Sequence, residues 1–386
     1  MNAKQIYEIV NGIASQSLGL TGLTATDVSF ISVGKEVLST DANKDAWYSA
    51  LADRIGKVTY SNVREYKSKE AVGLLKEPFD YGIALQKLYV DLVDASENVT
   101  WDGQSTPASD PFKKNTLSVK QKIFSPFGTW EYGITIPDVQ LKTAFTSAEE
   151  MGKFINGIML SVRNALILSM ENTAKLCRCR FIASKAKANR KQTYVNVLDM
   201  YNKLTGRNLT VATCQTDKEF LRYLALTIKL CSNYMENYSA TFNEEGYKRF
   251  TAKENQRLNI LSTMAENMAF YLESDTYHKE LVSLKGYSTV DFWQGCGDGT
   301  VNANYSFADV SKVQVNLDGA SDIVEVNGVV AVLYDSDAMG ITIDRKRTKS
   351  IYNPKGEYTN YFFKAEVGYF NDLSENGIVF YIAEVQ

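Results

Sequence analysis

The sequence contains a single histidine, His278, and this scarcity removes several common kinds of active site. A Ser-His-Asp or Cys-His catalytic arrangement would have to use this one residue, and sites that need several imidazole ligands are excluded. The surrounding residues are mostly charged or polar, which indicates a solvated loop or helix end. The sequence therefore predicts no catalytic histidine.

Cysteine is also scarce, with five residues in an odd and scattered set. Cys177 and Cys179 lie two apart on a predicted helix, so their side chains point to different faces. No second pair completes a zinc site, and we expect free thiols, as in a reducing compartment. The other three cysteines are Cys214, Cys231 and Cys296.

Long hydrophobic runs and a large net charge are both missing. No run reaches the length of a membrane span, and the N-terminus lacks the continuous apolar core of a signal peptide, so we expect a cytoplasmic product with no membrane partner. The formal net charge of −3 gives no overall electrostatic case for nucleic-acid binding. The 45% hydrophobic content and the 23 tyrosines are typical of a folded chain with extensive sheet and large contact surfaces.

Two stretches look like ligand sites but lack the residues that the chemistry needs. Residues 295–300 (GCGDGT) are rich in glycine, yet they have no P-loop Lys-Ser/Thr pair and no helix-forming sequence follows them. Asp335, Asp337 and Asp344 do not have the spacing of a calcium loop, and a turn between strands explains them. The sequence therefore predicts no catalytic residue, no cofactor and no metal.

The strongest positive signal is a helix from residue 147 to about residue 186. Apolar residues recur at spacings of three and four, Ser147 and Glu150 form a capping-box pattern, and no proline interrupts the run. Such a helix is far longer than usual, so it is either a large core helix or the spine of a flat, sheet-rich subunit, and the rest of the chain favours the spine. The predicted buried face comprises Met151, Phe154, Ile155, Ile158, Met159, Val162, Ala165, Leu166, Met170, Thr173 and Cys177.

Ahead of this helix, residues 58–136 alternate apolar and polar residues with a period of two, which predicts strands. We expect strands at about 83–93, 117–123 and 130–136, with residues 97–114 forming the loop of a long hairpin. A long hairpin cannot bury both faces within its own subunit. It therefore packs on a neighbour or is prone to aggregate, and we expect the neighbour.

The remaining segments are assigned more briefly. Residues 1–58 form an N-terminal arm with helices at 4–14 and 44–55, separated by a stretch rich in Gly, Thr and Ser. Thr216 is expected to cap a helix that has Phe220, Leu224, Ile228 and Cys231 on one face. Further expectations are a strand at 257–263, a helix at 264–272, exposed loops at 295–328, and strands at 329–334, 361–369 and 378–383. In the strand at 361–369, one face is expected to carry Tyr361, Phe363, Ala365, Val367 and Tyr369.

Three short motifs accompany this order of parts. They are 53–56 (DRIG) at the end of the arm, 141–145 (LKTAF) before the long helix, and 351–361 (IYNPKGEYTNY) near the C-terminus. In these residues the chain resembles the major capsid proteins of tailed phages with the Hong Kong 97-type fold, most closely the phi-29-like podophage group. The likeness covers most of 50–186 and 330–386. Ile351 departs from the family, which has arginine at that position of an Arg-Asn-Pro-Arg-Gly-like turn.

The resemblance implies an α+β, HK-97-like phage capsid fold in four parts. These are an N-terminal arm (1–58), an extended β-hairpin or E-loop (59–135), a peripheral domain with the spine helix (136–190 and 350–386), and an axial domain (191–349). The implied function is self-assembly into hexamers and pentamers of an icosahedral phage head that encloses double-stranded DNA without sequence-specific binding. The implied partners are further copies of the chain, a scaffolding protein and a portal. The implied location is the virion, after assembly in the host cytoplasm.

Eight residues are candidate assembly contacts: Trp101, Asp102, Pro111 and Phe112 near the hairpin tip, and Arg345, Lys346, Arg347 and Lys349 in the densest basic run. A solvated strand or loop also explains the basic run, whereas a functional role would be contact with phosphate or with an acidic strip on a neighbour. Two other functions stay open at this point. One is an encapsulin-like nanocompartment shell, and the other is a soluble enzyme that binds a phosphorylated ligand at residues 295–300.

Overall fold

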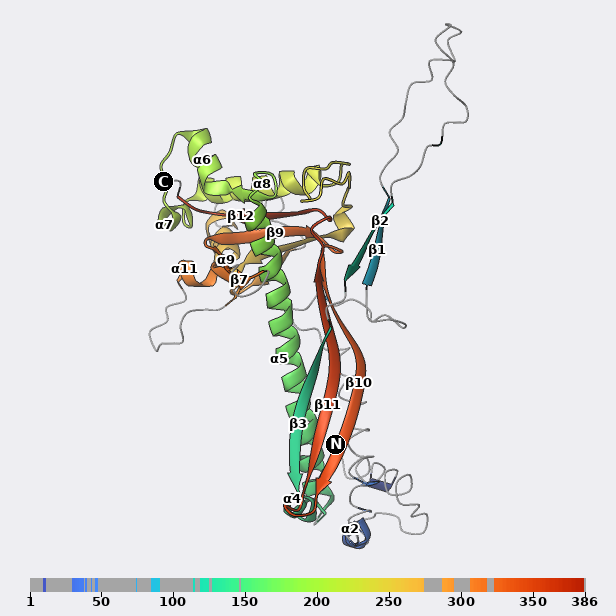
Figure 1. Ribbon diagram of the computed structural model, residues 1–386. Helices are drawn as coiled ribbons and strands as arrows, with labels where there is room; N and C mark the ends of the chain where they lie inside the picture. Colours follow the sequence, from blue (N-terminus) through green and yellow to red (C-terminus); the bar gives the residue numbers. More distant parts are fainter. Residues whose placement is uncertain are drawn as a thin grey trace. The chain divides into compact units, whose positions relative to one another are not determined.

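The computed structural model describes residues 10–11, 30–37, 39, 43, 46–47, 74, 85–90, 114, 119–124, 127–145, 147–273, 287–294, 306–317 and 323–384. The chain divides into two compact units (Figure 1). The first combines residues 1–78, 126–174 and 341–369, and the second combines 79–125, 175–340 and 370–386. The four-part domain division stays a prediction.

A three-stranded sheet in the order β10-β11-β3 is the centre of the first unit. Its strands are β3 (Phe127–Pro137), most of β10 (Met339–Asn353) and most of β11 (Tyr358–Asn371), and β3 pairs antiparallel with β11. The predicted inward face of β11 is confirmed at four of its five positions, since Tyr361, Phe363, Ala365 and Val367 are buried whereas Tyr369 is only half-buried. The strand predicted at 130–136 is therefore paired within this sheet and not with a strand of the hairpin.

The Asn-Pro-Lys-Gly sequence at residues 353–356 lies in the turn between β10 and β11, as expected. The Asn353 side chain accepts hydrogen bonds from the backbone N–H groups of Lys355 (3.1 Å) and Gly356 (3.2 Å). The left-handed residue of this turn is Glu357, with φ 50°, and not Gly356. Glycine is needed at 356 for a different reason, because an added Cβ would collide with the Tyr358 ring.

Helix α5 (Ala148–Ala188) has 41 residues and confirms the long helix predicted from the apolar spacing. The Ser147 hydroxyl accepts a hydrogen bond from the Glu150 N–H at 3.2 Å, while the Glu150 carboxylate pairs with Lys153 at 2.8 Å. Burial raises the pKa of Tyr132 on β3, and Ser169 of α5 partly offsets the rise, so helix and sheet are in contact within the first unit. The buried predicted positions are Met151, Ile155, Val162, Leu166, Met170, Thr173 and Cys177, whereas Phe154, Ile158 and Ala165 are half-buried. The eleventh predicted position, Met159, has a side chain outside the described part of the structure.

Two short helices complete the described part of the first unit: α2 (Phe30–Val37) and α4 (Asp138–Ala144). Helix α2 lies in the Gly/Thr/Ser-rich stretch where the sequence predicted no helix. It packs closely on Phe145, because a Cβ on Gly34 would lie 2.7 Å from that ring. Most of the helices predicted at 4–14 and 44–55 lies outside the described residues, although Trp47 is buried with its ring centroid 5.3 Å from that of Phe145.

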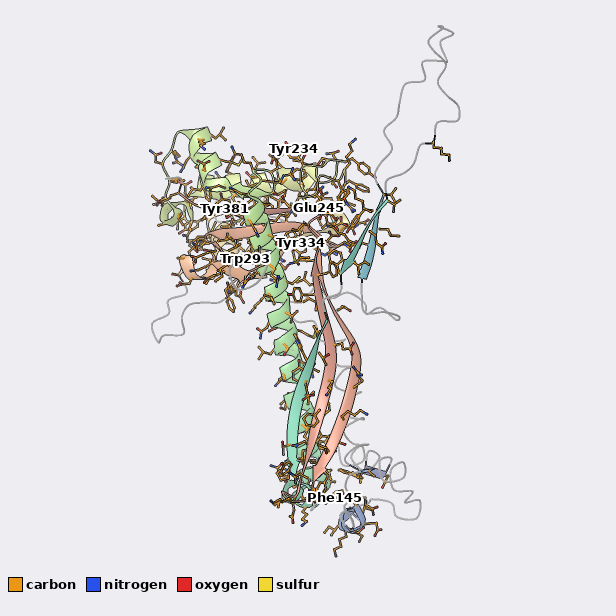
Figure 2. The ribbon with its side chains drawn as sticks, viewed as in Figure 1. Phe145, Tyr234, Glu245, Trp293, Tyr334 and Tyr381 are labelled. Carbon is orange, nitrogen blue, oxygen red and sulfur yellow. The ribbon has the colours of Figure 1, made fainter. Side chains whose placement is uncertain are left out.

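The second unit contains a five-stranded mixed sheet in the order β4-β12-β9-β5-β6. Its strands are β4 (Tyr194–Asn196), β12 (Gly377–Tyr381), β9 (Val329–Asp335), β5 (Gln256–Leu261) and β6 (Tyr287–Val290). All seven residues of β9 are buried, as expected for the central strand of a sheet covered on both faces. The strands predicted at 257–263, 329–334 and 378–383 are confirmed. Trp293 and Tyr334, both labelled in Figure 2, are buried residues of the second unit.

The helices of the second unit are α6 (Val197–Thr205), α7 (Val211–Cys214), α8 (Lys218–Tyr234) and α9 (Ser262–Glu273), with a 3-10 turn at Lys253–Asn255. Together with the sheet they enclose one apolar core that includes Phe220, Leu224 and Ile228 of α8. The prediction that Thr216 caps α8 is wrong. Asp217 caps α8, because its carboxylate accepts the Phe220 N–H at 2.8 Å.

The region from 295 to 328 was expected to be loop, and this is partly wrong. It contains α11 (Phe307–Val310) and the antiparallel pair β7 (Val313–Asn316) and β8 (Ile323–Val326). Val313, Val315 and Val326 are buried, so a weak period-two pattern of four residues was hidden among Gly, Asp and Asn. His278, Cys296 and the run 295–300 lie outside the described residues.

Candidate assembly interface

Strands β1 (Leu85–Val90) and β2 (Val119–Phe124) form the base of the predicted hairpin, and their antiparallel pairing confirms it. The register pairs Lys87 with Lys122 and Val90 with Val119. Directly opposed residues share one face of a two-stranded ribbon. The ribbon therefore has an inner face with Lys87, Tyr89 and Lys122, and an outer face that we define as Leu88, Val90, Val119 and Ile123.

The inner face is held by Asp372, which comes directly after β11 and belongs, like the hairpin strands, to the second unit. One carboxylate oxygen lies 3.0 Å from Lys87 Nζ and the other lies 3.3 Å from Lys122 Nζ. The Tyr89 hydroxyl also donates a hydrogen bond to this carboxylate. Lys87 Nζ donates further to the Asp337 carbonyl oxygen at 2.6 Å, and Lys122 pairs with Glu245. We call Lys87, Tyr89, Lys122 and Asp372 the hairpin anchor.

Asp372 stays ionised despite complete burial of its side chain. Burial alone would raise the pKa of Asp372, but hydrogen bonds from Ser374 and Tyr89 and the positive charge of Lys87 outweigh it and hold the pKa at about 2. Ser374 contributes both its N–H (3.1 Å) and its hydroxyl (2.6 Å). The anchor is thus a buried carboxylate with several donors and two cationic partners, the arrangement in which a buried charge is tolerated.

Aromatic and cationic contacts surround the anchor. The rings of Tyr89 and Tyr247 stack with centroids 5.6 Å apart, and the Arg249 guanidinium lies 4.6 Å from the Tyr89 centroid. Arg249 is itself fixed by Glu375, whose two carboxylate oxygens each lie 2.9 Å from one guanidinium nitrogen. Burial, followed by the hydrogen bond to Asp372, raises the pKa of Tyr89, so its hydroxyl stays a donor.

The outer face carries the opposite chemistry. Leu88 and Ile123 are each 62% exposed, Val90 is 58% exposed and Val119 is 56% exposed. A ribbon that turns charge inward and aliphatic side chains outward reverses the usual pattern of a half-buried strand, and a cluster of exposed aliphatic residues marks an interaction surface. This outer face is the candidate assembly interface.

The eight predicted contacts fall into two groups. Trp101, Asp102, Pro111 and Phe112 lie outside the described residues. Arg345, Lys346, Arg347 and Lys349 lie on β10, where Arg347 pairs with Glu366 at 2.6 Å and Lys349 is exposed. The sequence missed the hairpin anchor, although the alternation of Lys120 and Lys122 with Val119 and Ile123 was visible as a two-faced strand.

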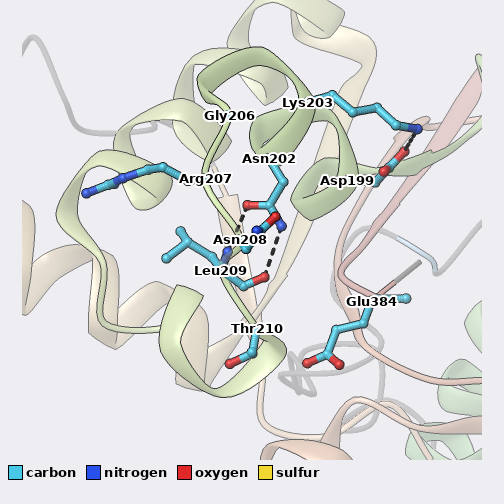
Figure 3. A pocket seen from close by; sticks show the side chains of 10 residues that line it. Asp199, Asn202, Lys203, Gly206, Arg207, Asn208, Leu209, Thr210 and Glu384 are labelled. Carbon is cyan, nitrogen blue, oxygen red and sulfur yellow. Dashed lines mark hydrogen bonds and ion pairs between the residues drawn. The ribbon is translucent and has the colours of Figure 1, made fainter. Parts of the chain in front are cut away.

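A polar depression of about 410 Å³ lies where α6, α7 and the C-terminal segment meet (Figure 3). Several of its polar side chains already form hydrogen bonds or ion pairs within the chain. Asn202 bridges the Leu209 N–H (3.1 Å) and carbonyl (2.9 Å), and Glu384 accepts the Val211 N–H at 3.1 Å. In the described part of the chain, no group of His, Cys, Asp and Glu could hold a metal ion, and no helix is long and apolar enough to cross a membrane.

Comparison with known proteins gives a family match over most of the chain. The family model described as Phi29-like phage major capsid protein matches residues 18–381. The curated major capsid protein of Bacillus phage GA-1 is 27% identical over 164 residues, which are 41% of this chain. That match spans about a third of the relative, 33% of its length.

Two solved structures resemble the fold. The capsid structure of Staphylococcus phage Andhra contains a chain that matches with a TM-score of 0.54 and 12% identity, over 80% of this chain and 83% of that one. A structure described as the head fiber and inner core protein gp22 of native bacteriophage P68 matches with a TM-score of 0.52 and 10% identity, also over 80% and 83%. At these identities the likeness concerns the fold alone.

Proposed function

Because this chain belongs to the Phi29-like phage major capsid protein family, we propose that its copies assemble by surface contact into the hexamers and pentamers of an icosahedral phage head. The fold is α+β and of the HK-97-like capsid type, as the resemblance implied. The family assignment makes the chain a capsid shell subunit found in the virion. It favours the phage shell over the encapsulin-like shell and the enzyme.

The observation that carries the assembly proposal is the two-faced hairpin base. The hairpin anchor fixes the inner face to the same chain through a buried carboxylate, so the outer face is held in a defined position. Four aliphatic residues on that face are still more than half exposed, so each would gain roughly 1–2 kcal/mol from complete burial. A second copy of the chain supplies the missing cover, because a shell is built from repeated copies.

The proposal also includes partners other than further copies of the chain. A scaffolding protein and a portal would act during assembly in the host cytoplasm, and double-stranded DNA would be enclosed without sequence-specific binding. The net charge of −3 fits a shell that does not attract DNA strongly to its wall. The subunit would work through contacts and not through catalysis. Arg345, Lys346, Arg347, Lys349 and the four residues near the hairpin tip stay proposed contacts.

The test is electron microscopy of the purified chain, produced alone and with the helper proteins of its phage, beside the double variant Leu88→Asp/Ile123→Asp. We expect the unmodified chain to form shells, capsomers or tubes, and we expect the variant to stay as soluble subunits because charges replace aliphatic contacts. Ile323→Asp is the matched control, since Ile323 is 58% exposed on β8, a strand that pairs with β7 and not with the hairpin strands.

Thermal unfolding of the unassembled subunits must accompany the images. The double variant and the control should unfold near the temperature of the unmodified chain, because all three side chains are exposed. Normal shells from the double variant would overturn the role of the outer face. A chain that stays monomeric under every condition would overturn the assembly function itself.

A further inference from the structure

Tyr194 and Tyr381 of the second unit form a stacked ring pair. Their ring centroids lie 4.0 Å apart and their planes differ by 14°. Aromatic pairs ordinarily prefer offset or edge-to-face arrangements, with centroids roughly 4.5–7 Å apart. The two rings are therefore closer, and more nearly face to face, than ring electrostatics alone favours, so the backbone has to hold them in place.

Strand pairing explains the position of the two rings. Tyr194 is the first residue of β4, and Tyr381, labelled in Figure 2, is the last residue of β12. The two strands run parallel with Val379 opposite Tyr194, and Tyr381 lies two residues further on, so both rings are on the same face of the sheet. Asn196 fixes this register, because its side chain donates to the Ala383 carbonyl at 2.9 Å and accepts the Ala383 N–H at 3.4 Å.

Both side chains are neutral phenols within reach of solvent. Burial, followed by repulsion from Tyr381, raises the pKa of Tyr194. Burial, followed by the negative charge of Asp199, raises the pKa of Tyr381. Each side chain is only half-buried. An oxidant can thus take electrons from the pair, and water can accept the phenolic protons.

We propose that Tyr194 and Tyr381 are a site of oxidative modification, where two equivalents of a one-electron oxidant join the rings as dityrosine. Each phenol gives one electron to the oxidant and one proton to water, which leaves a phenoxyl radical with spin on the ring carbons ortho to oxygen. The two radicals combine in a new carbon–carbon bond between ortho carbons. Each of these carbons then loses its hydrogen as a proton while the ring oxygen regains one, so the chain loses two hydrogen atoms in total.

Ring geometry decides which tyrosine pairs can couple. The unpaired spin occupies π orbitals perpendicular to the ring, so the bond forms between stacked faces, and rings already held together react faster than rings that must collide. The rings of Tyr201 and Tyr223 are tilted by 54°. Those of Tyr89 and Tyr247 are nearly parallel, at 18°, but their centroids are 5.6 Å apart. The pair on β4 and β12 is therefore the one expected to couple.

The new bond would join β4 and β12 covalently. These strands come from distant parts of the sequence, so the link closes a long loop, and a link of this kind stabilises a fold by restricting the unfolded chain. The described cysteines are free thiols, so a covalent staple in this part of the chain would come from tyrosine. The inference concerns a single subunit and does not depend on the proposed assembly.

The experiment is photo-oxidation of dilute, unassembled subunits of the full chain by tris(bipyridine)ruthenium(III), generated with light and persulfate. The unmodified chain is compared with Tyr194→Phe, Tyr381→Phe and the control Tyr247→Phe, which removes one phenol of a different stacked pair. A further sample of the unmodified chain is oxidised in urea. Monomers are isolated on a denaturing gel, measured for dityrosine fluorescence, and digested for mass spectrometry of linked peptides.

In the unmodified chain and in Tyr247→Phe, we expect a linked peptide pair that contains residues 194 and 381 and is lighter than the two peptides by two hydrogen atoms. This product should be lost in Tyr194→Phe, in Tyr381→Phe and in urea, because coupling needs both phenols and the folded sheet. A folded unmodified chain that links other tyrosines, or none, would overturn the inference. An equal yield in urea would also overturn it, since coupling would then come from random collision.

Thermal unfolding of the linked monomers tests the staple itself. The linked chain should melt several degrees above the chain before oxidation, because the unfolded state has lost conformational freedom. The Tyr194→Phe chain, treated in the same way, should show no such rise. An equal rise in both chains, or none in the linked chain, would overturn the stabilising role of the link.

Discussion

Replacing Asp372 by asparagine tests whether the buried carboxylate holds the hairpin to the chain. The amide keeps one acceptor oxygen for Ser374, but it loses the negative charge between Lys87 and Lys122. It also places an N–H₂ donor at the position of Oδ2, where Tyr89 and Lys87 both donate. We therefore expect the hairpin to detach more often while the rest of the second unit stays folded.

The magnitude follows from the pKa of Asp372, which falls from an ordinary 3.8 to about 2. Because one pKa unit corresponds to about 1.4 kcal/mol, the anchor stabilises the ionised form by roughly 2–3 kcal/mol. A group with a lowered pKa contributes this stability above its unfolded pKa and loses it as the pH falls through the folded value. The contribution of the anchor should thus be complete above about pH 4 and fade toward pH 2.

Hydrogen–deuterium exchange of unassembled subunits measures this loss segment by segment. An isolated two-stranded hairpin is marginal in water, so detachment should expose the amides of β1 and β2 to exchange. A loss of 2–3 kcal/mol corresponds to roughly a 30- to 140-fold rise in the open population and in exchange rate. The amides of β9 in the buried sheet serve as the internal reference and should keep their protection.

Glu245→Gln is the matched control. It removes only the second partner of Lys122, and both side chains are about one-third exposed, at 28% and 33%. Such a partly solvated pair contributes at most about 1 kcal/mol, so the exchange of β1 and β2 should change little. Unchanged protection of the hairpin amides in Asp372→Asn would refute the reasoning, as would an equal loss in β9.

Two further pairs of substitutions probe the two units separately. Gly328→Ala should destabilise the second unit by about 2 kcal/mol or more, seen as a lower melting temperature, because Gly328 has φ 73° and an added Cβ would collide with the Ile382 carbonyl oxygen. Gly206→Ala, with φ 70° but open space around it, should cost only about half as much, and equal costs would contradict the collision. Ile155→Asp, at a position 1% exposed on α5, should abolish soluble folded protein, whereas Leu160→Asp, 57% exposed on the same helix, should fold; a folded Ile155→Asp would contradict the assignment of the buried face.

The elements that could be predicted from sequence are those with a long, regular signal. Helix α5 has eleven predicted face positions, and the inward residues of β11 alternate over nine residues, so local periodicity alone identifies them. Helix α2 and strands β7 and β8 were missed because four to eight residues carry too few repeats of either period. Their buried valines are fixed by packing and not by local pattern.

The hairpin anchor could not be predicted, for a different reason. Lys87 and Asp372 are 285 residues apart in sequence, and no local rule brings them together. The period-two pattern of β2 is the same whichever face turns inward, and lysine on one face ordinarily indicates solvent. The lysine face of β2 turns inward only because Lys122 pairs with the buried carboxylate of Asp372. The outer face can therefore be identified as a candidate interface only from the structure, which shows Lys87, Tyr89 and Lys122 on the inner face bound to Asp372.

The hairpin anchor also bears on the entropy of association. A flexible loop that becomes ordered only on contact loses conformational freedom at that moment, and the loss reduces affinity. Here the base of the hairpin is already ordered by Asp372 within its own chain. A modest aliphatic surface can then bind without a large ordering cost, and contacts of modest strength can dissociate and re-form. Preorganisation of this kind would let misplaced subunits leave a growing shell before it closes.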